Sequence, residues 1–313
     1  MKFMISFFSP KKLCLAAFIL LAAFVLVWFT SRSYTDPVVR EVSMESDKIS
    51  DPVRFVFIAD LHENVFGENN RPFYDQLKAL DPDFILIGGD IINWTSEKDA
   101  YAVEVITELA GFADVYFSIG NHEIEYLRLR REIEFNGLNR NNSSLTLVNT
   151  DENGFIRKIE RAGATVLQKS WVDIEINGTK LRIGGAYEEM RSLDPDNPKD
   201  TMLPGMYAFL SGFQDTDSLK LYMTHRPYSF LGKSGPSSWD IDVVLCGHEH
   251  GGQVVLPGLG GLYSRERGLF PKYTHGVFGF GGTTLIVTSG VGSDAEPLPR
   301  FNNRPEIVLV TIT

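Results

Sequence analysis

The sequence predicts a mixed α/β fold, and three observations support this prediction. Between residues 53 and 131, short apolar runs with strand character alternate with amphipathic stretches of helical spacing, the order of elements in an α/β sheet. From residue 166 onward the predicted elements are mostly strands. The pairs Asn177-Gly178 and Gly281-Gly282 predict hairpin turns between some of them. The second half of the chain is therefore expected to add antiparallel strands.

The first half alternates strand, helix and strand. Its predicted strands cover residues 53–59, 83–88 and 114–119, and its predicted helices cover residues 72–80 and 100–111 and begin again at residue 123. In the second half, the predicted strands cover residues 166–168, 172–176, 180–185, 219–223, 241–246, 253–256, 276–280, 283–288 and 307–312.

The N-terminal segment predicts a membrane anchor. Residues 13–29 form an unbroken run of 17 apolar residues, directly preceded by Lys11 and Lys12, at the short end for a transmembrane helix. We interpret residues 1–34 as an uncleaved signal anchor, with a removed signal peptide as the alternative. The positive-inside rule then gives a single-pass protein of the cell membrane whose body is extracytoplasmic. Residues 35–50 predict a polar linker, which leaves 51–313 as the globular domain.

Composition narrows the classes of function. The chain has 30 basic and 40 acidic residues, a net charge of −10, and only four of the basic residues and none of the acidic ones precede residue 36. An acidic body of this kind disfavours nucleic-acid binding and flat attachment to anionic lipid. The two cysteines, Cys14 and Cys246, predict neither a disulfide nor a zinc site. A metal site must therefore be built from His, Asp and Asn. Nothing in the sequence indicates the oligomeric state.

Side chains that commonly bind metals follow five of the predicted strands. They are Asp60 and His62, Asp90, Asn121 and His122, His225, and His248 and His250. Taken singly, such a histidine is usually a loop or core residue and a Gly-Asp pair is usually a turn. Together, at the carboxyl ends of strands, where ligands of α/β sheets gather, they predict a hydrolytic site with two metal ions. Asp90 is the natural bridge between the ions, because it lies between the other groups in chain order.

These motifs resemble the calcineurin-like metallophosphoesterases. The motifs D-x-H, G-D, G-N-H-E and G-H-x-H, with a lone histidine after a strand, occur in that order from Asp60 to His250. The tail, with Gly268-Leu-Phe-Pro-Lys-Tyr and Asn303-Arg-Pro-Glu-Ile, further resembles the bacterial membrane-anchored YkuE/YaeI-like subgroup. The resemblance implies a four-layer α/β/β/α sandwich of two mixed sheets, with metals at one edge.

The resemblance also implies a role for each matching residue. One ion would be held by Asp60, His62, Asp90 and His250, and the other by Asp90, Asn121, His225 and His248. The implied ions are Mn, Fe or Zn, and a hydroxide between them would attack phosphorus in line. His122 is implied to be catalytic rather than a ligand, stabilising the charged phosphate and protonating the leaving oxygen.

Some positions depart from the family pattern. Asn93 stands where many relatives have an aspartate that supports the catalytic histidine, so we expect a lower pKa for His122. Glu249 replaces a common threonine between the paired histidines and is expected to face water. His275 fits no metal motif and is expected to be structural or superficial. Solvated surface charges are expected at Arg226, Arg265 and Arg267.

The predicted function is hydrolysis of a phosphodiester or phosphomonoester at the outer face of the membrane. One alternative is a pyrophosphatase that acts on a lipid-linked nucleotide sugar or another phospholipid. The other is a metal-dependent membrane scaffold without catalysis. The sequence identifies neither the native metals nor the substrate, and it leaves open whether that substrate is lipid-linked.

Overall fold

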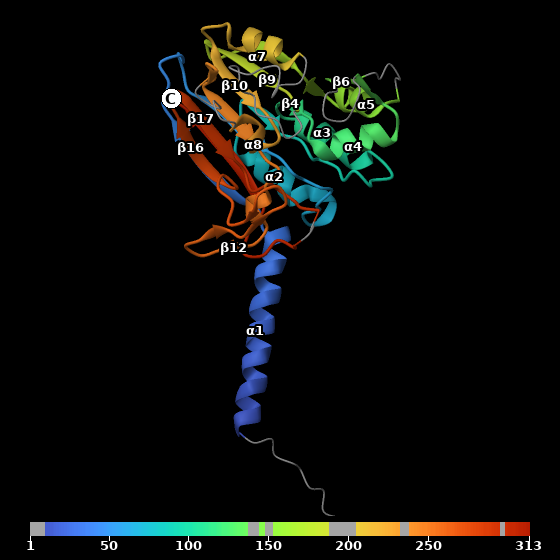
Figure 1. The fold of residues 1–313 in the computed structure, drawn as a ribbon, viewed down its shortest axis with the longest axis vertical. Helices are drawn as coiled ribbons and strands as arrows, with labels where there is room; N and C mark the ends of the chain where they lie inside the picture. Colours follow the sequence, from blue (N-terminus) through green and yellow to red (C-terminus); the bar gives the residue numbers. More distant parts are fainter. Residues whose placement is uncertain (1–9, 137–143, 148–152, 188–204, 232–237, 295–297) are drawn as a thin grey trace, which may run out of the picture.

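The computed structural model describes residues 10–136, 144–147, 153–187, 205–231, 238–294 and 298–313. A single globular body stands on one end of a long helix (Figure 1). The described helices are α1 (Pro10–Thr35), η1 (Glu68–Asn70), α2 (Arg71–Ala79), α3 (Ala100–Ala110), α4 (Asn121–Leu129), α5 (Phe155–Arg161), α7 (Met206–Gln214), α8 (Pro227–Phe230) and η3 (His250–Gly252).

Two six-stranded sheets form the body. The first contains, in spatial order, β1 (Val38–Met44), β18 (Glu306–Ile312), β2 (Val53–Ile58), β3 (Phe84–Ile87), β4 (Asp114–Ser118) and β7 (Ala164–Leu167). The second contains β16 (Gly276–Phe280), β17 (Thr283–Val287), β11 (Val243–Cys246), β10 (Leu219–Met223), β9 (Thr179–Gly185) and β8 (Ser170–Ile176).

Both sheets are mixed. In the first, β2, β3, β4 and β7 are parallel to one another, and β1 and β18 are parallel to each other; the two groups meet where β18 pairs with β2 in the antiparallel direction. In the second, β17, β11, β10 and β9 are parallel, and β16 and β8 are antiparallel edge strands. Small hairpins lie outside the sheets: β5 (Ile133–Asn136) with β6 (Ser144–Leu147), β12 (Val255–Leu256) with β13 (Gly260–Gly261), and β14 (Tyr263–Ser264) with β15 (Gly268–Leu269).

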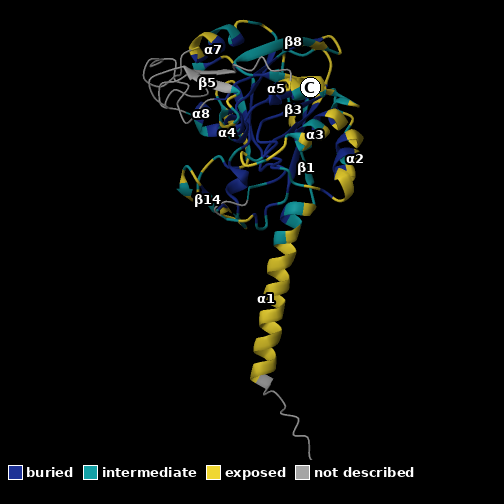
Figure 2. Ribbon diagram, turned by 90° about the vertical axis from the view of Figure 1, so that its right-hand side faces the viewer, coloured by how far each residue is buried: buried dark blue, intermediate teal, exposed yellow. Residues whose placement is uncertain are grey.

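The layers follow from the two-residue period of the strands. In β2, Phe55 and Phe57 pack between the two sheets, whereas Val56 and Ile58 pack against the outer helices. In the second sheet, Leu245 of β11 faces the same central layer, and its neighbours along the strand pack toward α7 and α8. The strands are largely buried while α1 is exposed along its length (Figure 2). The predicted four-layer sandwich is confirmed.

α1 is long and apolar enough to cross a membrane, by length and composition, and none of its apolar stretch is buried against the body. It is the single such helix among the described residues.

The body begins earlier than expected, because β1 pairs with β18 in parallel from Val38↔Glu306 to Met44↔Ile312. The predicted linker over residues 35–50 is therefore wrong across β1. An edge strand exposes half of its surface and so tolerates the charges of Arg40 and Glu41, which hid the strand in the sequence.

The C-terminal turn of α1 is bonded to the body. Asn303 donates its backbone N–H to Ser33 Oγ (3.1 Å), and Arg300 donates its backbone N–H to Tyr34 Oη (2.9 Å). Ser33 is fully buried. Asn64 Nδ2 also donates to the carbonyl of Tyr34 (2.9 Å). α1 is therefore docked on the body at defined contacts and is not joined to it through a coil.

Candidate metal centre

The loops that follow β2, β3 and β4 in the first sheet meet the loops that follow β10 and β11 in the second. His248 donates its backbone N–H to both carboxylate oxygens of Asp60, each at 3.0 Å. A Cβ on Gly247 would collide with the Asp60 carboxylate, which explains the glycine before His248. The structure thus brings the seven predicted ligands and His122 to one edge of the sandwich.

One group of ligand atoms lies around Asp60. Single ligand atoms of Asp60, His62 and His250 lie within 4.8 Å of one another. His62 Nε2 is 4.0 Å from Asp60 Oδ1 and 3.8 Å from Asp90 Oδ2. This arrangement matches the first of the two predicted ligand sets.

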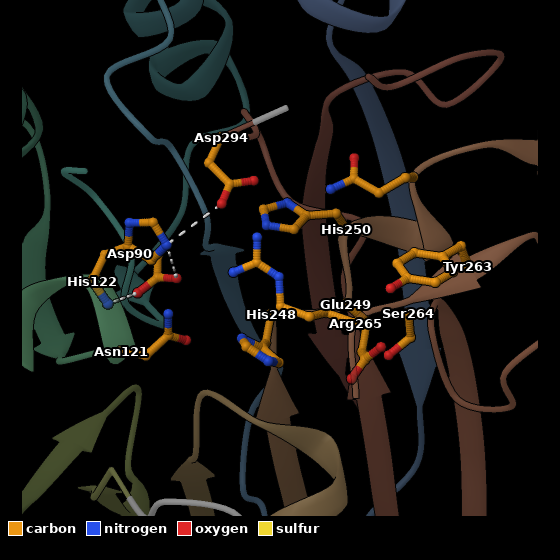
Figure 3. Close-up of a pocket in the computed structure, with 11 residues that line it drawn as sticks. Asp90, Asn121, His122, His248, Glu249, His250, Tyr263, Ser264, Arg265 and Asp294 are labelled. Atoms are coloured by element: carbon orange, nitrogen blue, oxygen red, sulfur yellow. Dashed lines mark hydrogen bonds and ion pairs between the residues drawn. The ribbon is translucent and has the colours of Figure 1, made fainter. Parts of the chain in front are cut away.

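A second group lies around Asp90. Ligand atoms of Asp90, His225 and His248 lie within 4.8 Å of one another, and His225 Nε2 is 3.0 Å from Asp90 Oδ2. Asn121 lines the same pocket, with its amide directed toward the space beside His248 (Figure 3). Asp90 therefore contacts both groups, as a bridging carboxylate must.

The backbone at these positions is strained. Five of the predicted ligands, Asp60, His62, Asp90, His248 and His250, have positive φ angles between 46° and 71°. Each such non-glycine residue costs about 1–2 kcal/mol. Strain of this kind concentrates at functional sites, where the surrounding structure holds it.

Glu123 holds two of these loops together. It is fully buried and accepts backbone N–H groups from Gly120 (2.8 Å), Asp90 (2.7 Å), Ile91 (2.8 Å) and Ile92 (3.3 Å). The Glu123 carboxylate therefore holds the turn that contains Asp90 against the first turn of α4, which contains Asn121 and His122. The sequence displayed Glu123 within G-N-H-E but offered no reason to assign it this role.

The C-terminal segment braces the other two loops. Arg300, fully buried, donates to the carbonyls of Ser289 (2.7 Å) and Gly292 (2.8 Å), and Gly292 N–H in turn donates to the Asp60 carbonyl (2.6 Å). Asn303 Nδ2 donates to the carbonyl of His250 (2.6 Å). The roles of Arg300 and Asn303 were not predicted, because the residues around them in the sequence do not indicate which distant loops they contact.

Hydrogen bonds orient the candidate ligand rings. His225 Nδ1 contacts the carbonyl of Gly88 at 2.8 Å, which places the proton on Nδ1 and leaves Nε2 free to bind a cation. His248 Nε2 contacts Glu266 Oε1 at 3.0 Å, so that Nδ1 is the free nitrogen of that ring. Glu266 was not predicted, since it lies 18 residues after the histidine it orients.

The electrostatics favour a bound cation. Burial lowers the pKa of His62 to about 3 and that of His248 to about 4, so both rings are neutral, the form that ligates metals. Burial, assisted by the neighbouring Asp90 charge, raises the pKa of Asp60 to about 7 against the opposing effect of His225. Burial acts to lower the pKa of His225, but the neighbouring Asp90 carboxylate outweighs burial and raises that pKa to about 9. A metal ion would take the place of that proton between the two buried carboxylates.

Unsatisfied atoms provide a further test of whether metals fit. Among the described residues, several buried polar atoms have no hydrogen-bond partner, including His62 Nε2, Asn121 Oδ1 and His250 Nδ1. Buried lone pairs are rarely left without a partner, and these belong to the residues of the two ligand groups. Nitrogen and carboxylate or amide oxygen donors of this mixture suit Mn, Fe or Zn. The donor set therefore fits metal ions.

Comparison with known proteins decides the family. The family model of the calcineurin-like phosphoesterases matches residues 53–252, more than half of the chain. The chain belongs to this family of metal-dependent phosphohydrolases. The matched region contains every predicted ligand, and the expected resemblance is confirmed.

Several relatives carry the same assignment. This phosphoesterase is 25% identical to the phosphodiesterase YaeI of Escherichia coli over 83% of this chain and 82% of the relative. It is 30% identical to the uncharacterized metallophosphoesterase YkuE of Bacillus subtilis over 48% of this chain and 47% of that protein. A Caenorhabditis elegans metallophosphoesterase is 25% identical over 90% of this chain, which spans only 53% of the nematode protein's length.

Solved structures are more distant. A protein of Thermus thermophilus aligns over 78% of this chain and 90% of its own, with 12% identity and a TM-score of 0.40. The NAD nucleotidase of Haemophilus influenzae aligns over 78% of this chain and 45% of its own, with 14% identity and a TM-score of 0.41.

In this phosphoesterase His122 faces the pocket from the start of α4. Its Nε2 lies 3.8 Å from Asp294 Oδ2 and 4.0 Å from Asp90 Oδ2 (Figure 3). Trp94 donates its backbone N–H to His122 Nδ1 at 3.2 Å, which leaves the ring proton on Nε2, toward the pocket. Asp294 was not predicted, because it follows no motif and reaches the pocket from the opposite end of the sequence.

The expected role of Asn93 is wrong. Its Oδ1 lies 3.1 Å from His62 Nδ1, and its Nδ2 donates to the carbonyl of His62 (3.1 Å) and to Glu63 Oε2 (3.0 Å). It therefore orients a candidate ligand, while a backbone N–H occupies the position beside His122.

The expectation for Glu249 is also wrong. The residue is 3% exposed, and neither carboxylate oxygen has a hydrogen-bond partner of good geometry among the described residues. Burial raises the pKa of Glu249 to about 7. It lines the pocket together with Tyr263, Ser264 and Arg265, and it lies between two residues with positive φ angles, His248 and His250.

The arginines and His275 have different outcomes. Arg226 is not a solvated surface charge: its side chain is 12% exposed and Nη1 lies 3.2 Å from Glu266 Oε1. Arg265 lines the pocket, and Arg267 lies over the ring of Tyr228. His275 pairs with Glu306 and is not among the pocket-lining residues, in agreement with a structural role.

Proposed function

We propose that this protein hydrolyses a phosphodiester at a centre of two metal ions, at the outer face of the membrane. The observation that supports this most directly is the meeting of two ligand groups at Asp90, with His122 beside them. The ligands proposed are those given above for each ion, Asp60, His62, Asp90 and His250 for one, and Asp90, Asn121, His225 and His248 for the other.

The chain's own residues define the reaction site. When bound, the metal ions supply positive charge for the phosphoryl oxygens and make water a nucleophile at neutral pH. Glu123 holds Asp90 in place between the two ligand groups. The Nε2–H of His122 donates a hydrogen bond to a phosphoryl oxygen and then to the leaving oxygen, from the pocket side of the ring, and so stabilises the negative charge that develops on each. Arg265, in the pocket wall, supplies a guanidinium for the second ester branch.

α1 supports a location of the protein at the outer face of the membrane. An apolar helix preceded by Lys11 and Lys12 favours a single-pass anchor with the body outside the cytoplasm. Because the helix is docked on the body, the catalytic edge stays near the lipid headgroups. This geometry favours a substrate in the membrane or close to it, and the diester itself is either soluble or lipid-linked.

Turnover should depend on added metal. The full chain in detergent, stripped by a chelator and then given Mn²⁺, is expected to hydrolyse bis-p-nitrophenyl phosphate, whereas the stripped protein is not. The rate is measured as nitrophenolate release with Mn²⁺, Fe²⁺ and Zn²⁺ in parallel. Absence of turnover with all three ions would favour the membrane scaffold. Cleavage of a nucleotide-sugar anhydride but of no ester would favour the pyrophosphatase.

Two truncations should separate anchoring from folding. Removal of residues 1–27 keeps Ser33 and Tyr34 and should leave activity on a soluble diester nearly unchanged, while lowering activity on a diester embedded in vesicles at least about tenfold. Removal of residues 1–34 also breaks the bonds to Asn303 and Arg300. It should lower the free energy of unfolding by about 1–3 kcal/mol, since buried partners lose their hydrogen bonds.

Urea unfolding and the two assays measure these effects. Equal stability of the two truncated proteins would contradict the docking of α1. Equal activity of the full chain and the shorter truncation on the embedded diester would mean that the substrate is soluble and that the anchor only sets the compartment.

A further inference from the structure

Two hairpins project from the body at the end where α1 leaves it. We call residues 254–270, with β12–β13 and β14–β15, the interfacial hairpins. Figure 1 shows β12 beside the top of α1, and Figure 2, turned by 90°, shows β14 at the same end. Both views therefore place the hairpins on the side of the body that faces along α1.

Contacts fix this placement. Val255 of β12 donates its backbone N–H to the Phe301 carbonyl (3.1 Å), and Phe301 N–H donates to the carbonyl of Gln253 (3.2 Å). The ring of Phe301 packs on Phe29 of α1, with centroids 5.6 Å apart. Phe29 is the last residue of the 17-residue apolar run. The base of the first hairpin thus lies level with the end of the segment that we place in the bilayer.

The hairpins expose large apolar side chains. Leu259 and Leu269, 69% and 67% exposed, are the two most exposed large apolar residues that the structure describes outside α1, and Phe270 is 53% exposed. Leu259 lies in the turn of the first hairpin, and Leu269 and Phe270 lie at the end of the second. Such exposed residues are unfavourable in water and favourable at the boundary between headgroups and acyl chains. The neighbouring α1, unburied and apolar, makes lipid the surrounding medium there.

Charge supports the same partner. Residues 254–275 contain three basic residues and one acidic residue, although the whole chain has a net charge of −10. The basic residues are Arg265, Arg267 and Lys272. A local excess of basic residues beside exposed leucines suits phosphate headgroups.

We propose that the interfacial hairpins insert Leu259, Leu269 and Phe270 into the headgroup region of the bilayer, as a second membrane contact beside α1. This proposal rests on the membrane location of α1 given under the proposed function. The same hairpins supply Tyr263, Ser264 and Arg265 to the pocket wall. Insertion therefore opens the pocket toward lipid headgroups, and the substrate class that reaches it without leaving the membrane is a phospholipid diester.

Single-cysteine probes test the contact directly. In a Cys14→Ser background, where the remaining Cys246 is buried, Leu259→Cys is labelled with a polarity-sensitive fluorophore and the full chain is placed in phosphatidylglycerol–phosphatidylcholine nanodiscs. The matched control is Leu129→Cys, 53% exposed on α4, which lies away from the end where α1 emerges (Figure 1). A third probe at Ala22→Cys reports on α1.

The probe at Leu259 should show a blue-shifted emission and quenching by lipids that carry a shallow nitroxide, and the probe at Leu129 should show neither. If the Ala22 probe is quenched and the Leu259 probe is not, the second contact does not exist while the anchor does. If neither is quenched, the membrane location of α1 itself fails. If Leu259 is shielded without lipid quenching, a second copy or another protein covers the hairpin and the proposal is overturned.

Kinetics give an independent readout. Leu259→Glu combined with Leu269→Glu should lower turnover of a phospholipid diester in the nanodiscs roughly a hundredfold, about the effect of losing the transfer of two leucines from water at roughly tenfold each. Turnover of soluble bis-p-nitrophenyl phosphate should stay the same, as should both rates in Leu129→Glu. An equal loss on the two substrates would show that the hairpins act on the pocket structure and not through lipid.

Discussion

Asp90→Asn should bind at most one metal ion and lose turnover, because a neutral amide bridges two cations poorly. The side chain is 1% exposed and contacts both ligand groups. The amide oxygen can still accept the backbone N–H of His122, a bond of 2.8 Å, so the fold of the loop should survive. Elemental analysis of the purified protein measures the number of ions per chain, beside the rate on a soluble diester.

A matched change should have no such effect. Asp75→Asn removes an aspartate whose side chain is 67% exposed on α2, and it should keep the metal content and the activity of the parent protein. Two tightly bound ions in Asp90→Asn would refute the bridging role. Loss of ions in both variants would instead point to a general effect on folding or purification.

His122→Ala should keep both ions and lower turnover by roughly 10²–10⁴-fold, the range for a lost general acid. The loss should be larger for an alkoxide leaving group than for nitrophenolate, since nitrophenolate leaves without a proton. Both the metal content and the rates must be measured, because a ring nitrogen of His122 lies with atoms of Asp90 and His62 within 4.8 Å of one another, a spacing that a ligand would share.

The outcomes separate the two roles of His122. Equal losses for both leaving groups would exclude proton donation and leave only stabilisation of the phosphate. Loss of an ion would make His122 a ligand. His275→Ala, which removes a histidine paired with Glu306 outside the pocket, is the control and should keep the ratio of the two rates.

The candidate ligands could be selected from the sequence because each stands directly after an apolar run, and their role as ligands stays a prediction. Runs such as Val243–Cys246 are buried on both faces, and in such strands the first polar side chain after the run lies at the sheet edge. The order of the motifs along the chain then indicated the family, which no single motif could do. The layers followed from the family resemblance, since strand periodicity alone does not say how two sheets stack.

The sequence failed where an assignment depended on loop conformation or on distant contacts. Glu249 lies between two histidines, and only the positive φ angles on both sides turn it inward. The contact of Asn93 with His62 was not predicted, because neighbouring rings at one sheet edge cannot be told apart along a chain. β1 was missed because its burial comes from β18, which lies more than 250 residues away.

The bond between Ser33 and Asn303 joins residues 270 positions apart, and this separation sets the order in which the protein can mature. During synthesis the end of α1 emerges early, whereas its hydrogen-bond partner Asn303 and the buried Arg300 emerge much later. Contacts of such long sequence separation form late in folding. The loop of Asp60 thus stays without its support until Arg300 has been synthesised and has folded against Ser289 and Gly292. If the two ions bind as proposed, their capture is therefore a late event in folding.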